Sequence, residues 1–357
     1  PAWLGDLDLT IGQSTYAMGI GGLHSTEANR AVHADDDHVM IDFDVASYYP
    51  TIIINSGLYP RSVGRAFLDV YRAIRDERVV AKRAGEKTKA EGLKISLNGV
   101  YGKLGSQWSI LYAPHLTIAV TLTGQLALLM LIERAELAGI PVVSANTDGV
   151  VFRCPVDLQD TLTDITRQWE IDTGFEPEST PYSALFSQSV NSYIAVKPDG
   201  KAKRKGPLAN PYKEGMRDQL MKNPSMGIVT DAVVEFLTKG TPFEDTIRQG
   251  RDIRDFVTVV NVKGGGTWRG EYLGKVVRYI WSTDGQEILY KTPDPRTGNH
   301  KKVSKTDGCR PVMELPDQFP SDVNFERYIE AAREVLMDIG FDRRPERIRP
   351  IRITKAN

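Results

Sequence analysis

Apolar and polar positions alternate over residues 38–45, HVMIDFDV, and this period of two predicts a β-strand. Val39, Ile41, Phe43 and Val45 would lie on one face of the strand, with both aspartates of the segment on the other. Asp44 is the second of the two aspartates in this segment and lies near its end. We therefore expect its carboxylate at the end of the strand, within reach of a ligand.

The stretch from Ser144 to Phe152, SANTDGVVF, predicts a β-hairpin, because Asn-Thr-Asp-Gly separates two short apolar runs. Asp148 within it has two interpretations, as a turn residue or as a ligand of a metal ion. The segment alone leaves both open.

Helical periodicity predicts helices over residues 62–84, 88–101, 117–138, 225–239, 242–256 and 324–339. The first two would form a helical hairpin that turns at AGEK. Residues 183–206 predict another β-hairpin, which turns at KPDGK, and residues 257–290 are strand-like. This irregular order of helices and strands indicates an α+β fold.

Composition is that of an ordinary globular protein, with 41% hydrophobic and 25% charged residues among 357. No run approaches the roughly 18 to 20 apolar residues that cross a bilayer, and the N-terminal residues show no signal-peptide pattern. Cys154 and Cys309 are too few for a disulfide framework or a four-cysteine zinc site. We therefore expect a cytoplasmic protein without a membrane partner.

The net charge of −1 conceals two basic segments. Residues 61–103 contain 11 Lys or Arg against 5 Asp or Glu, and residues 197–205 contain five basic residues and one Asp. Such segments can form a phosphate-binding surface. A solvated charged face is the alternative.

The two predicted helices of the first basic segment each place polar groups on one face. Lys94, Asn98 and Tyr101 follow the spacing i, i+4, i+7, and Arg78 and Lys82 share a face of the preceding helix. Arg suits bidentate phosphate contacts and Lys suits point-charge contacts. The helical hairpin is therefore a candidate clamp for a triphosphate.

Three segments resemble the conserved motifs of family B DNA polymerases, in the family's order and at its intervals. DVASYYP at 44–50 resembles motif A, KISLNGVYG at 94–102 resembles motif B, and NTDG at 146–149 resembles motif C. The family patterns are D-x-x-S-L-Y-P, K-x-x-x-N-S-x-Y-G and D-T-D-S. YAMGIGG at 16–22 is similar to the Tyr/Gly-Gly element of phage members, and residues 191–206 are similar to the K-x-Y hairpin that grips the primer–template duplex.

The resemblance implies a right-hand architecture with an antiparallel-sheet palm, short two-helix fingers and a thumb. Residues 1–60 would form an N-terminal linker and part of the palm, and residues 61–102 the fingers. Residues 103–206 would complete the palm, with motif C and the hairpin, and residues 207–357 the thumb and C-terminal region.

The resemblance also implies roles for individual residues. Asp44 and Asp148 would bind two Mg²⁺ ions, with Mn²⁺ as an alternative, and the backbone carbonyl of Val45 would be a further ligand. Lys94 would assist the leaving pyrophosphate. Nucleotide contacts are implied for Ser47, Tyr48, Tyr49, Arg78, Lys82, Lys94 and Asn98. DNA contacts are implied for Gly21, Gly22, Tyr101, Gly102, Thr147, Tyr193, Lys203, Lys205 and Gly206.

The implied activity is template-dependent addition of dNMP from a dNTP to a primer 3′-hydroxyl, because Tyr49 matches the position whose ring blocks a ribose 2′-hydroxyl. Primer–template DNA and dNTP are the implied partners. One alternative is a catalytically weak, polymerase-like nucleic-acid-binding subunit of a replication assembly. Another is an RNA-synthesising or primer-making enzyme, against which Tyr49 argues.

Several positions depart from the family pattern. Asn146 replaces the first acid of motif C, Gly99 and Gly149 replace serines, and Asn191 replaces the lysine of K-x-Y. Only 43 residues precede Asp44, fewer than a proofreading exonuclease domain needs. We therefore expect no proofreading in this chain, with an exonuclease or other replication proteins as candidate partners in a bacterial or phage-infected cell.

Overall fold

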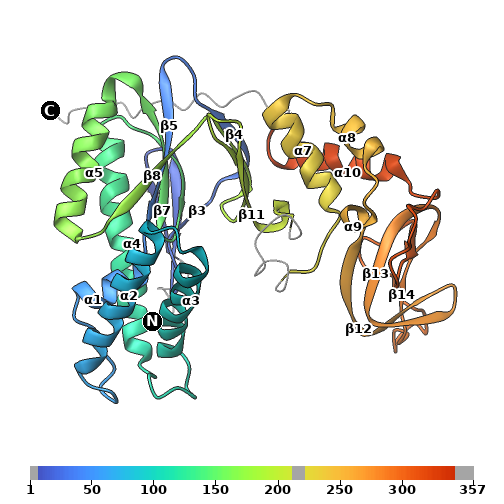
Figure 1. Ribbon diagram of the computed structural model, residues 1–357, viewed down its shortest axis with the longest axis horizontal. Helices are drawn as coiled ribbons and strands as arrows, with labels where there is room; N and C mark the ends of the chain where they lie inside the picture. Colours follow the sequence, from blue (N-terminus) through green and yellow to red (C-terminus); the bar gives the residue numbers. More distant parts are fainter. Residues whose placement is uncertain (1–6, 211–221, 342–357) are drawn as a thin grey trace. The chain divides into compact units, whose positions relative to one another are not determined.

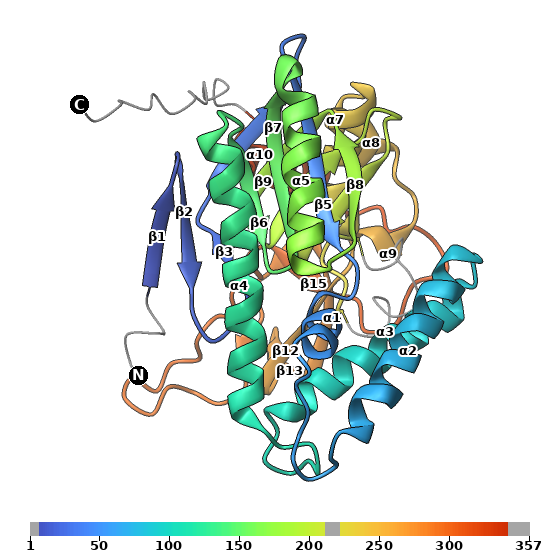
Figure 2. The same cartoon turned by 90° about the vertical axis from the view of Figure 1, so that its left-hand side faces the viewer.

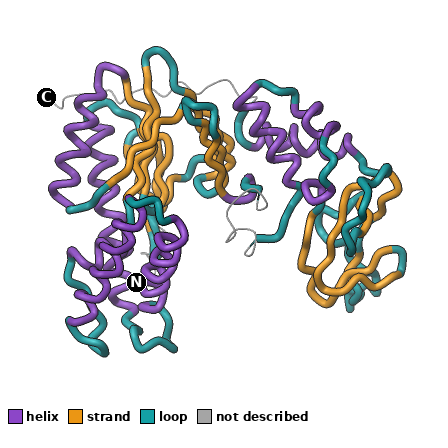
Figure 3. The backbone as a smooth tube through the Cα atoms, viewed as in Figure 1, coloured by secondary structure: helices purple, strands orange, loops and turns teal. Residues whose placement is uncertain are grey.

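The computed structural model describes residues 7–210 and 222–341. The chain divides into two compact units. Among the described residues, the first comprises 7–28 and 32–184, and the second comprises 29–31, 185–210 and 222–341. Figures 1 and 3 show the helices and strands of each unit.

The first unit is built on a seven-stranded sheet in which every neighbouring pair of strands is antiparallel. Its strands, in spatial order, are β1 (Leu7–Ile11), β2 (Ser14–Met18), β3 (His24–Ser25), β6 (Val142–Asn146), β7 (Gly149–Pro155), β5 (His38–Val45) and β8 (Pro177–Tyr182). The strand predicted over 38–45 is therefore β5, and the predicted hairpin is β6 with β7. Both β7 and β8 pair with β5, so the end of β5 lies between two neighbours.

Helices cover one face of this sheet. Figure 2 shows α4 (Pro114–Leu137) and α5 (Gln159–Thr173) in front of the strands, and α4 contacts both β6 and β7. The fully buried side chains of the core include Phe152 from the sheet, Ile132 from α4 and Trp169 from α5. A short 3₁₀ turn, η2 (Val156–Leu158), leads from β7 into α5.

Three further helices lie beyond the end of β5: α1 (Tyr48–Asn55), α2 (Ala66–Arg83) and α3 (Lys87–Leu104). The last two form the predicted helical hairpin, although α2 begins four residues later than the pattern indicated. Leu68, Tyr71 and Leu97 are buried between them, and the Tyr71 hydroxyl donates to the Leu97 carbonyl at 2.9 Å. The hairpin therefore has a largely apolar inner face, and Arg78 is the buried cation on that face of α2.

No segment long and apolar enough to cross a bilayer is expected from the sequence, but helix α4 meets that criterion. Its 24 residues are long and apolar enough to cross a membrane by length and composition alone. Its scattered Thr, Gly and Gln residues interrupt the apolar run but lower the mean hydropathy of the helix only slightly. Half of its most apolar window is buried, however, and the helix packs on α1, α5 and the sheet. A core helix meets the same criterion, so α4 is weak evidence for a membrane.

The second unit contains a four-stranded sheet with the order β11 (Ala202–Lys205), β10 (Ser192–Val196), β9 (Ala184–Ser189) and β4 (Ala28–His33). It continues through η3 (Gly206–Leu208). The hairpin predicted over 183–206 thus belongs mostly to the second unit, whereas the domain division from the sequence grouped it with motif C.

The rest of the second unit is a helical group beside another four-stranded sheet. The helices are α7 (Gly227–Lys239), α8 (Phe243–Gln249), α9 (Ile253–Phe256) and α10 (Phe325–Asp338). The strands, in spatial order, are β14 (Leu289–Tyr290), β12 (Thr258–Trp268), β13 (Glu271–Gln286) and β15 (Cys309–Pro311). The single helix predicted over 242–256 is wrong: the chain turns at Gly250, where an added Cβ would lie 2.9 Å from the Phe256 ring.

Candidate active site

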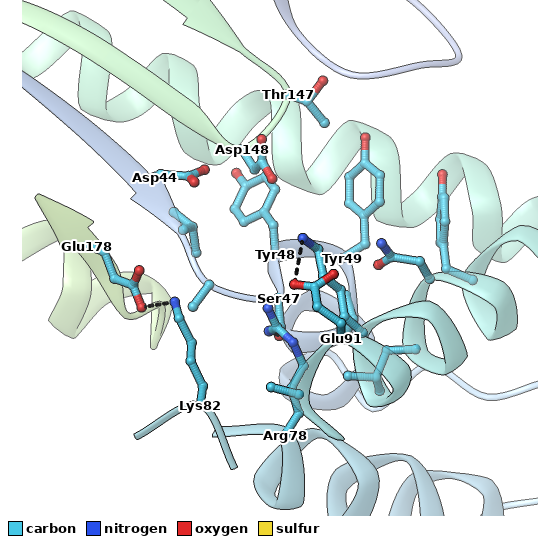
Figure 4. Close-up of a pocket in the computed structure, with 18 of the residues that line it drawn as sticks. Asp44, Ser47, Tyr48, Tyr49, Arg78, Lys82, Glu91, Thr147, Asp148 and Glu178 are labelled. Carbon is cyan, nitrogen blue, oxygen red and sulfur yellow. Dashed lines mark hydrogen bonds and ion pairs between the residues drawn. The ribbon is translucent and has the colours of Figure 1, made fainter. Parts of the chain in front are cut away.

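Asp44 and Asp148 are brought together by the pairing of β5 with β7. Asp44 lies opposite Gly149, the residue after Asp148. The Val45 N–H donates to the carbonyl oxygen of Asp148 at 2.8 Å. Figure 4 shows both carboxylates beside one cavity of about 840 Å³, which Val45 also lines. Two acids distant in the sequence therefore share one site.

The turn that presents Asp148 is strained. The Asp148 N–H donates to the Asn146 carbonyl at 2.6 Å, and Thr147 between them has a φ of 56°. This is the rarer γ-turn, with positive φ at its central residue. Backbone strain of this kind costs free energy and is concentrated at functional sites.

The predicted Gly-Gly element supports this turn from outside the cavity. An added Cβ on Gly22 would lie 2.4 Å from the Thr147 hydroxyl, so only glycine admits this approach. The Thr147 N–H donates to the Leu23 carbonyl at 2.7 Å. Gln125 of α4 donates to the Gly21 carbonyl. Neither glycine lines the cavity, and Gly22 is the one that packs against the Asp148 turn.

Ser47 and Arg78 form the second strained feature of the cavity. Ser47 adopts the left-handed conformation, with φ 55° and ψ 46°, immediately before α1. Its hydroxyl accepts a hydrogen bond from the Arg78 guanidinium. Arg78 is only 9% exposed, its Nε has no hydrogen-bond partner, and it forms no ion pair with a described residue. A buried cation without a counter-ion attracts an anion strongly, because the surroundings screen its charge poorly.

Two other predicted phosphate ligands are paired with carboxylates. The Lys82 ammonium contacts Glu178, which lies opposite Asp44 on β8, and the Lys94 ammonium lies 3.7 Å from Glu91. All four side chains line the cavity. These side chains are half-exposed, so each ion pair contributes little free energy, and each lysine can readily exchange its carboxylate for another anion.

The tyrosines of motifs A and B have different environments. Tyr48 is buried, and its hydroxyl donates to the Gly124 carbonyl at 2.6 Å. An added Cβ on Gly124 would lie 2.9 Å from the Tyr48 ring, so this glycine makes room for it. The Tyr49 ring packs on the Tyr101 ring, with centroids 4.5 Å apart. Burial raises the pKa of the Tyr49 phenol above its usual range, so it stays protonated.

The cavity brings together all the residues predicted to bind metal or nucleotide, with Tyr101 and Thr147 from the predicted DNA contacts. It is lined by Asp44, Val45, Ser47, Tyr48, Tyr49, Arg78, Lys82, Lys94, Asn98, Tyr101, Thr147 and Asp148. Gly102 follows Tyr101 on α3 but does not line it. The sequence analysis missed Lys87, Glu91 and Glu178, which do.

The remaining predicted DNA contacts lie in the second unit, on the hairpin of β10 and β11. Tyr193 lies opposite Lys205, whose ammonium is 5.9 Å from the centre of the tyrosine ring. Lys203 lies two residues earlier on β11 and therefore shares this face. Gly206 has a φ of 68°, and an added Cβ would lie 2.3 Å from the Asn191 carbonyl oxygen. The hairpin thus presents an aromatic and cationic face.

The donor set of the cavity suits a hard divalent cation that is bound together with a substrate. Within residues 7–210 and 222–341, no three His, Cys, Asp or Glu side chains form a group that could hold a metal ion. Asp44 and Asp148 thus supply two carboxylates without a third. Mg²⁺ commonly binds through one or two carboxylates, with water and substrate phosphates completing its coordination. The residues present fit that mode.

Comparison with known proteins finds similarity to DNA polymerases over part of the chain. DNA polymerase 1 of Saccharolobus solfataricus is 27% identical over 118 residues, or 32% of this chain and 13% of that protein. DNA polymerase 1 of Sulfurisphaera ohwakuensis is 27% identical over 119 residues, or 33% and 13%. The matched part thus spans about an eighth of each relative.

The family B DNA polymerase from the hyperthermophilic archaeon Pyrobaculum calidifontis is similar in structure, with a TM-score of 0.48 and 15% identity. The similarity covers 88% of this chain and 46% of that one. The chain matches no protein-family model.

Proposed function

We propose that this chain is the polymerising part of a family B DNA polymerase, which adds dNMP units from dNTPs to a primer 3′-hydroxyl on a DNA template. One observation carries the proposal: two carboxylates, Asp44 and Asp148, line a single cavity with Arg78, a buried cation that has no ion pair within the described part of the chain. The sequence similarity to archaeal DNA polymerases supports it. Palm, fingers and thumb would correspond to the large antiparallel sheet, the α2–α3 hairpin and the second unit.

Asp44 and Asp148 would hold two Mg²⁺ ions, or Mn²⁺ in their place. Such ions, when bound, lower the pKa of a coordinated hydroxyl and neutralise charge that develops on phosphate oxygens. Asn146 carries no charge where the family pattern has an acid. Its carbonyl instead accepts the hydrogen bond that closes the γ-turn, so its backbone retains a structural role.

The chain's own cations would bind and orient the triphosphate. Arg78 has an Nε–H that no described residue accepts. Lys87, at the first residue of α3, lines the same cavity one helical repeat of seven before Lys94. Lys82 and Lys94 would exchange their carboxylate partners for phosphate oxygens. Binding of the nucleotide therefore replaces weak internal ion pairs with charge-assisted contacts to the substrate.

A primer-extension assay tests the proposal directly. The full chain, a labelled primer on a longer DNA template, Mg²⁺ and four dNTPs should yield products whose sequence follows the template. Binding of the primer–template without any extension would favour the alternative of a catalytically weak subunit. Primer-independent synthesis from rNTPs would favour a primer-making enzyme.

Replacement of Tyr49 by alanine should weaken discrimination against ribonucleotides by at least about tenfold, because a side chain that rejects a substrate by bulk typically contributes 1 to 3 kcal/mol. Its ring is held against Tyr101 and is available to exclude a 2′-hydroxyl. The measurement is the ratio of kcat/KM for dATP and ATP in single-nucleotide extension. Tyr49→Phe keeps the ring and should keep the ratio; equal ratios in the wild type and Tyr49→Ala would remove the proposed role.

Replacement of Glu178 by glutamine should tighten dNTP binding by up to about fivefold, because it frees Lys82 from a half-exposed ion pair of the kind worth about 1 kcal/mol or less. Pre-steady-state extension gives the apparent Kd for the dNTP. Glu176→Gln is the matched control, since Glu176 pairs with Arg83 at 3.7 Å and does not line the cavity. Loss of turnover without tighter binding would instead place Glu178 among the acids that the chemistry requires.

A further inference from the structure

The second unit contains a cavity of its own, of about 470 Å³. It lies between α7 and α10, which pack together, and is closed by η3, by Trp281 of β13 and by the loop 302–307. Its buried or half-buried apolar lining is formed by Leu208, Met226, Val229, Ala331 and Val335. A volume of this size lies in the range that binds small organic ligands.

The indole N–H of Trp281 is an unmatched donor in this cavity. Trp281 is 7% exposed, and its Nε1 has no hydrogen-bond partner. Other described tryptophans differ: Trp169 donates to the Ala127 carbonyl at 2.7 Å and Trp268 to the Cys309 carbonyl at 3.1 Å, while Trp108 is exposed. A buried indole N–H usually has an acceptor, so Trp281 requires one from a ligand or from water.

Three cationic side chains also line this cavity. The Arg327 guanidinium lies 5.3 Å from the centre of the Trp281 ring, and Lys302 and Lys305 occupy the neighbouring loop. Lys302 is paired with Asp307 at 2.6 Å. Lys305 forms no ion pair with a described residue, and its carbonyl accepts a hydrogen bond from Tyr279. This side of the cavity therefore favours an anionic oxygen ligand.

The backbone of the cavity is strained in the same way as that of the first unit's cavity. Lys305 has a φ of 63° and Met226 a φ of 41°, both in the left-handed region. In the first unit, Ser47 and Thr147 also have positive φ and line the cavity that contains Asp148. Strained non-glycine residues persist where surrounding contacts hold them, and they are concentrated at ligand sites.

Toward its C-terminal end, α10 lines the cavity with hydrogen-bond acceptors. Asp338 accepts one from Gln188 at 3.0 Å, and Glu334, one helical turn before it, forms no ion pair with a described residue. The lining would thus offer a ligand hydrogen-bond donors, apolar groups and a carboxylate.

We propose that this cavity binds a nucleoside monophosphate. The phosphate would accept from Trp281 Nε1 and pair with Lys305, the base would lie on the apolar lining, and a sugar hydroxyl or base amino group would donate to Glu334. An amino acid would offer a carboxylate to the cations and an ammonium to Glu334, but it fills a much smaller part of the volume. All the groups involved belong to the second unit, so the site stands independently of the polymerase proposal.

Nuclear magnetic resonance of the ¹⁵N-labelled full chain tests the site through its indole signals. The chain has five tryptophans, and Trp281→Phe assigns the signal of interest by its loss. Titration with dAMP should shift the Trp281 signal saturably. Inorganic phosphate should shift it at higher concentrations, and deoxyadenosine should leave it unmoved. Lys305→Gln should weaken dAMP binding about tenfold, as expected for loss of one charge-assisted contact.

Matched variants separate recognition from general effects. Lys301→Gln removes a neighbouring lysine that pairs with Asp294 and does not line the cavity, and it should leave the affinity unchanged. Glu334→Gln should weaken dAMP binding more than phosphate binding. Arg78→Ala, which alters only the first unit's cavity, should leave the Trp281 titration intact even if the polymerase proposal fails.

Two results would overturn the proposal. A Trp281 signal that does not move at about 10 mM dAMP, where a site of millimolar affinity is largely filled, would mean that the cavity holds water only. A shift with the same affinity in the wild type, Lys305→Gln and Glu334→Gln would mean that these residues do not recognise the ligand.

Discussion

Primer extension is expected to fall at least about 10³-fold when either Asp44 or Asp148 is replaced by asparagine, because the bound metal ions supply several kcal/mol of transition-state stabilisation. Asparagine keeps the size of each side chain and removes its charge. Both carboxylates line one cavity, and no third acidic side chain completes a metal-binding group with them among residues 7–210 and 222–341. The loss of either one therefore leaves a single carboxylate. Single-turnover extension in Mg²⁺ measures the effect.

A matched control on the same strand distinguishes this effect from misfolding. Asp42 lies two residues before Asp44 on the same face of β5, but it is buried, accepts a hydrogen bond from Tyr182 and does not line the cavity. Asp42→Asn keeps an acceptor for that hydrogen bond and should retain activity. Thermal melting of each variant checks the fold. Extension at near wild-type rates by folded Asp44→Asn or Asp148→Asn would contradict the proposed function.

Elements with a regular local pattern could be predicted from the sequence. The alternation over 38–45 gives β5 with its observed bounds, because strand alternation is a property of neighbouring residues. The helix over 242–256 was not predicted correctly, because the helical pattern continues past Gly250, whereas the extended ψ of 132° at this residue ends α8. The addition of β1, β2 and β3 to the edge of β6 also has no local signal, since strand order depends on long-range pairing.

In the candidate site, too, residues placed by local spacing could be predicted, whereas residues placed by long-range pairing could not. Lys94, Asn98 and Tyr101 line the cavity together because helical spacing fixes their common face. Continuing that spacing toward the start of α3 would have added Lys87 and Glu91. Glu178 has no such signal, because only the pairing of β8 with β5 places it opposite Asp44.

The burial of Arg78 without a counter-ion is likewise a property of the folded chain, and it gives the second large expected effect. Arg78→Ala should weaken dNTP binding by about 10- to 100-fold, because a hydrogen bond to a charged group contributes about 1.5 to 3 kcal/mol. The Nε–H without a partner and the low exposure of the side chain both point to an anion that residues 7–210 and 222–341 do not supply. The apparent Kd for the dNTP, from single-turnover extension, is the quantity to measure.

Two controls separate contact with the triphosphate from support of the motif A turn. Arg75→Ala removes a cation one turn earlier on α2 that pairs with Asp76 at 2.6 Å and does not line the cavity, so it should leave the Kd unchanged. Ser47→Gly removes the hydroxyl that Arg78 contacts but suits the left-handed backbone. If Ser47→Gly weakened dNTP binding as much as Arg78→Ala, the guanidinium would act through the turn. If Arg78→Lys restored only part of the affinity while Ser47→Gly stayed close to the wild type, Arg78 would act on the phosphates themselves, since lysine offers a point charge in place of a planar fork of donors.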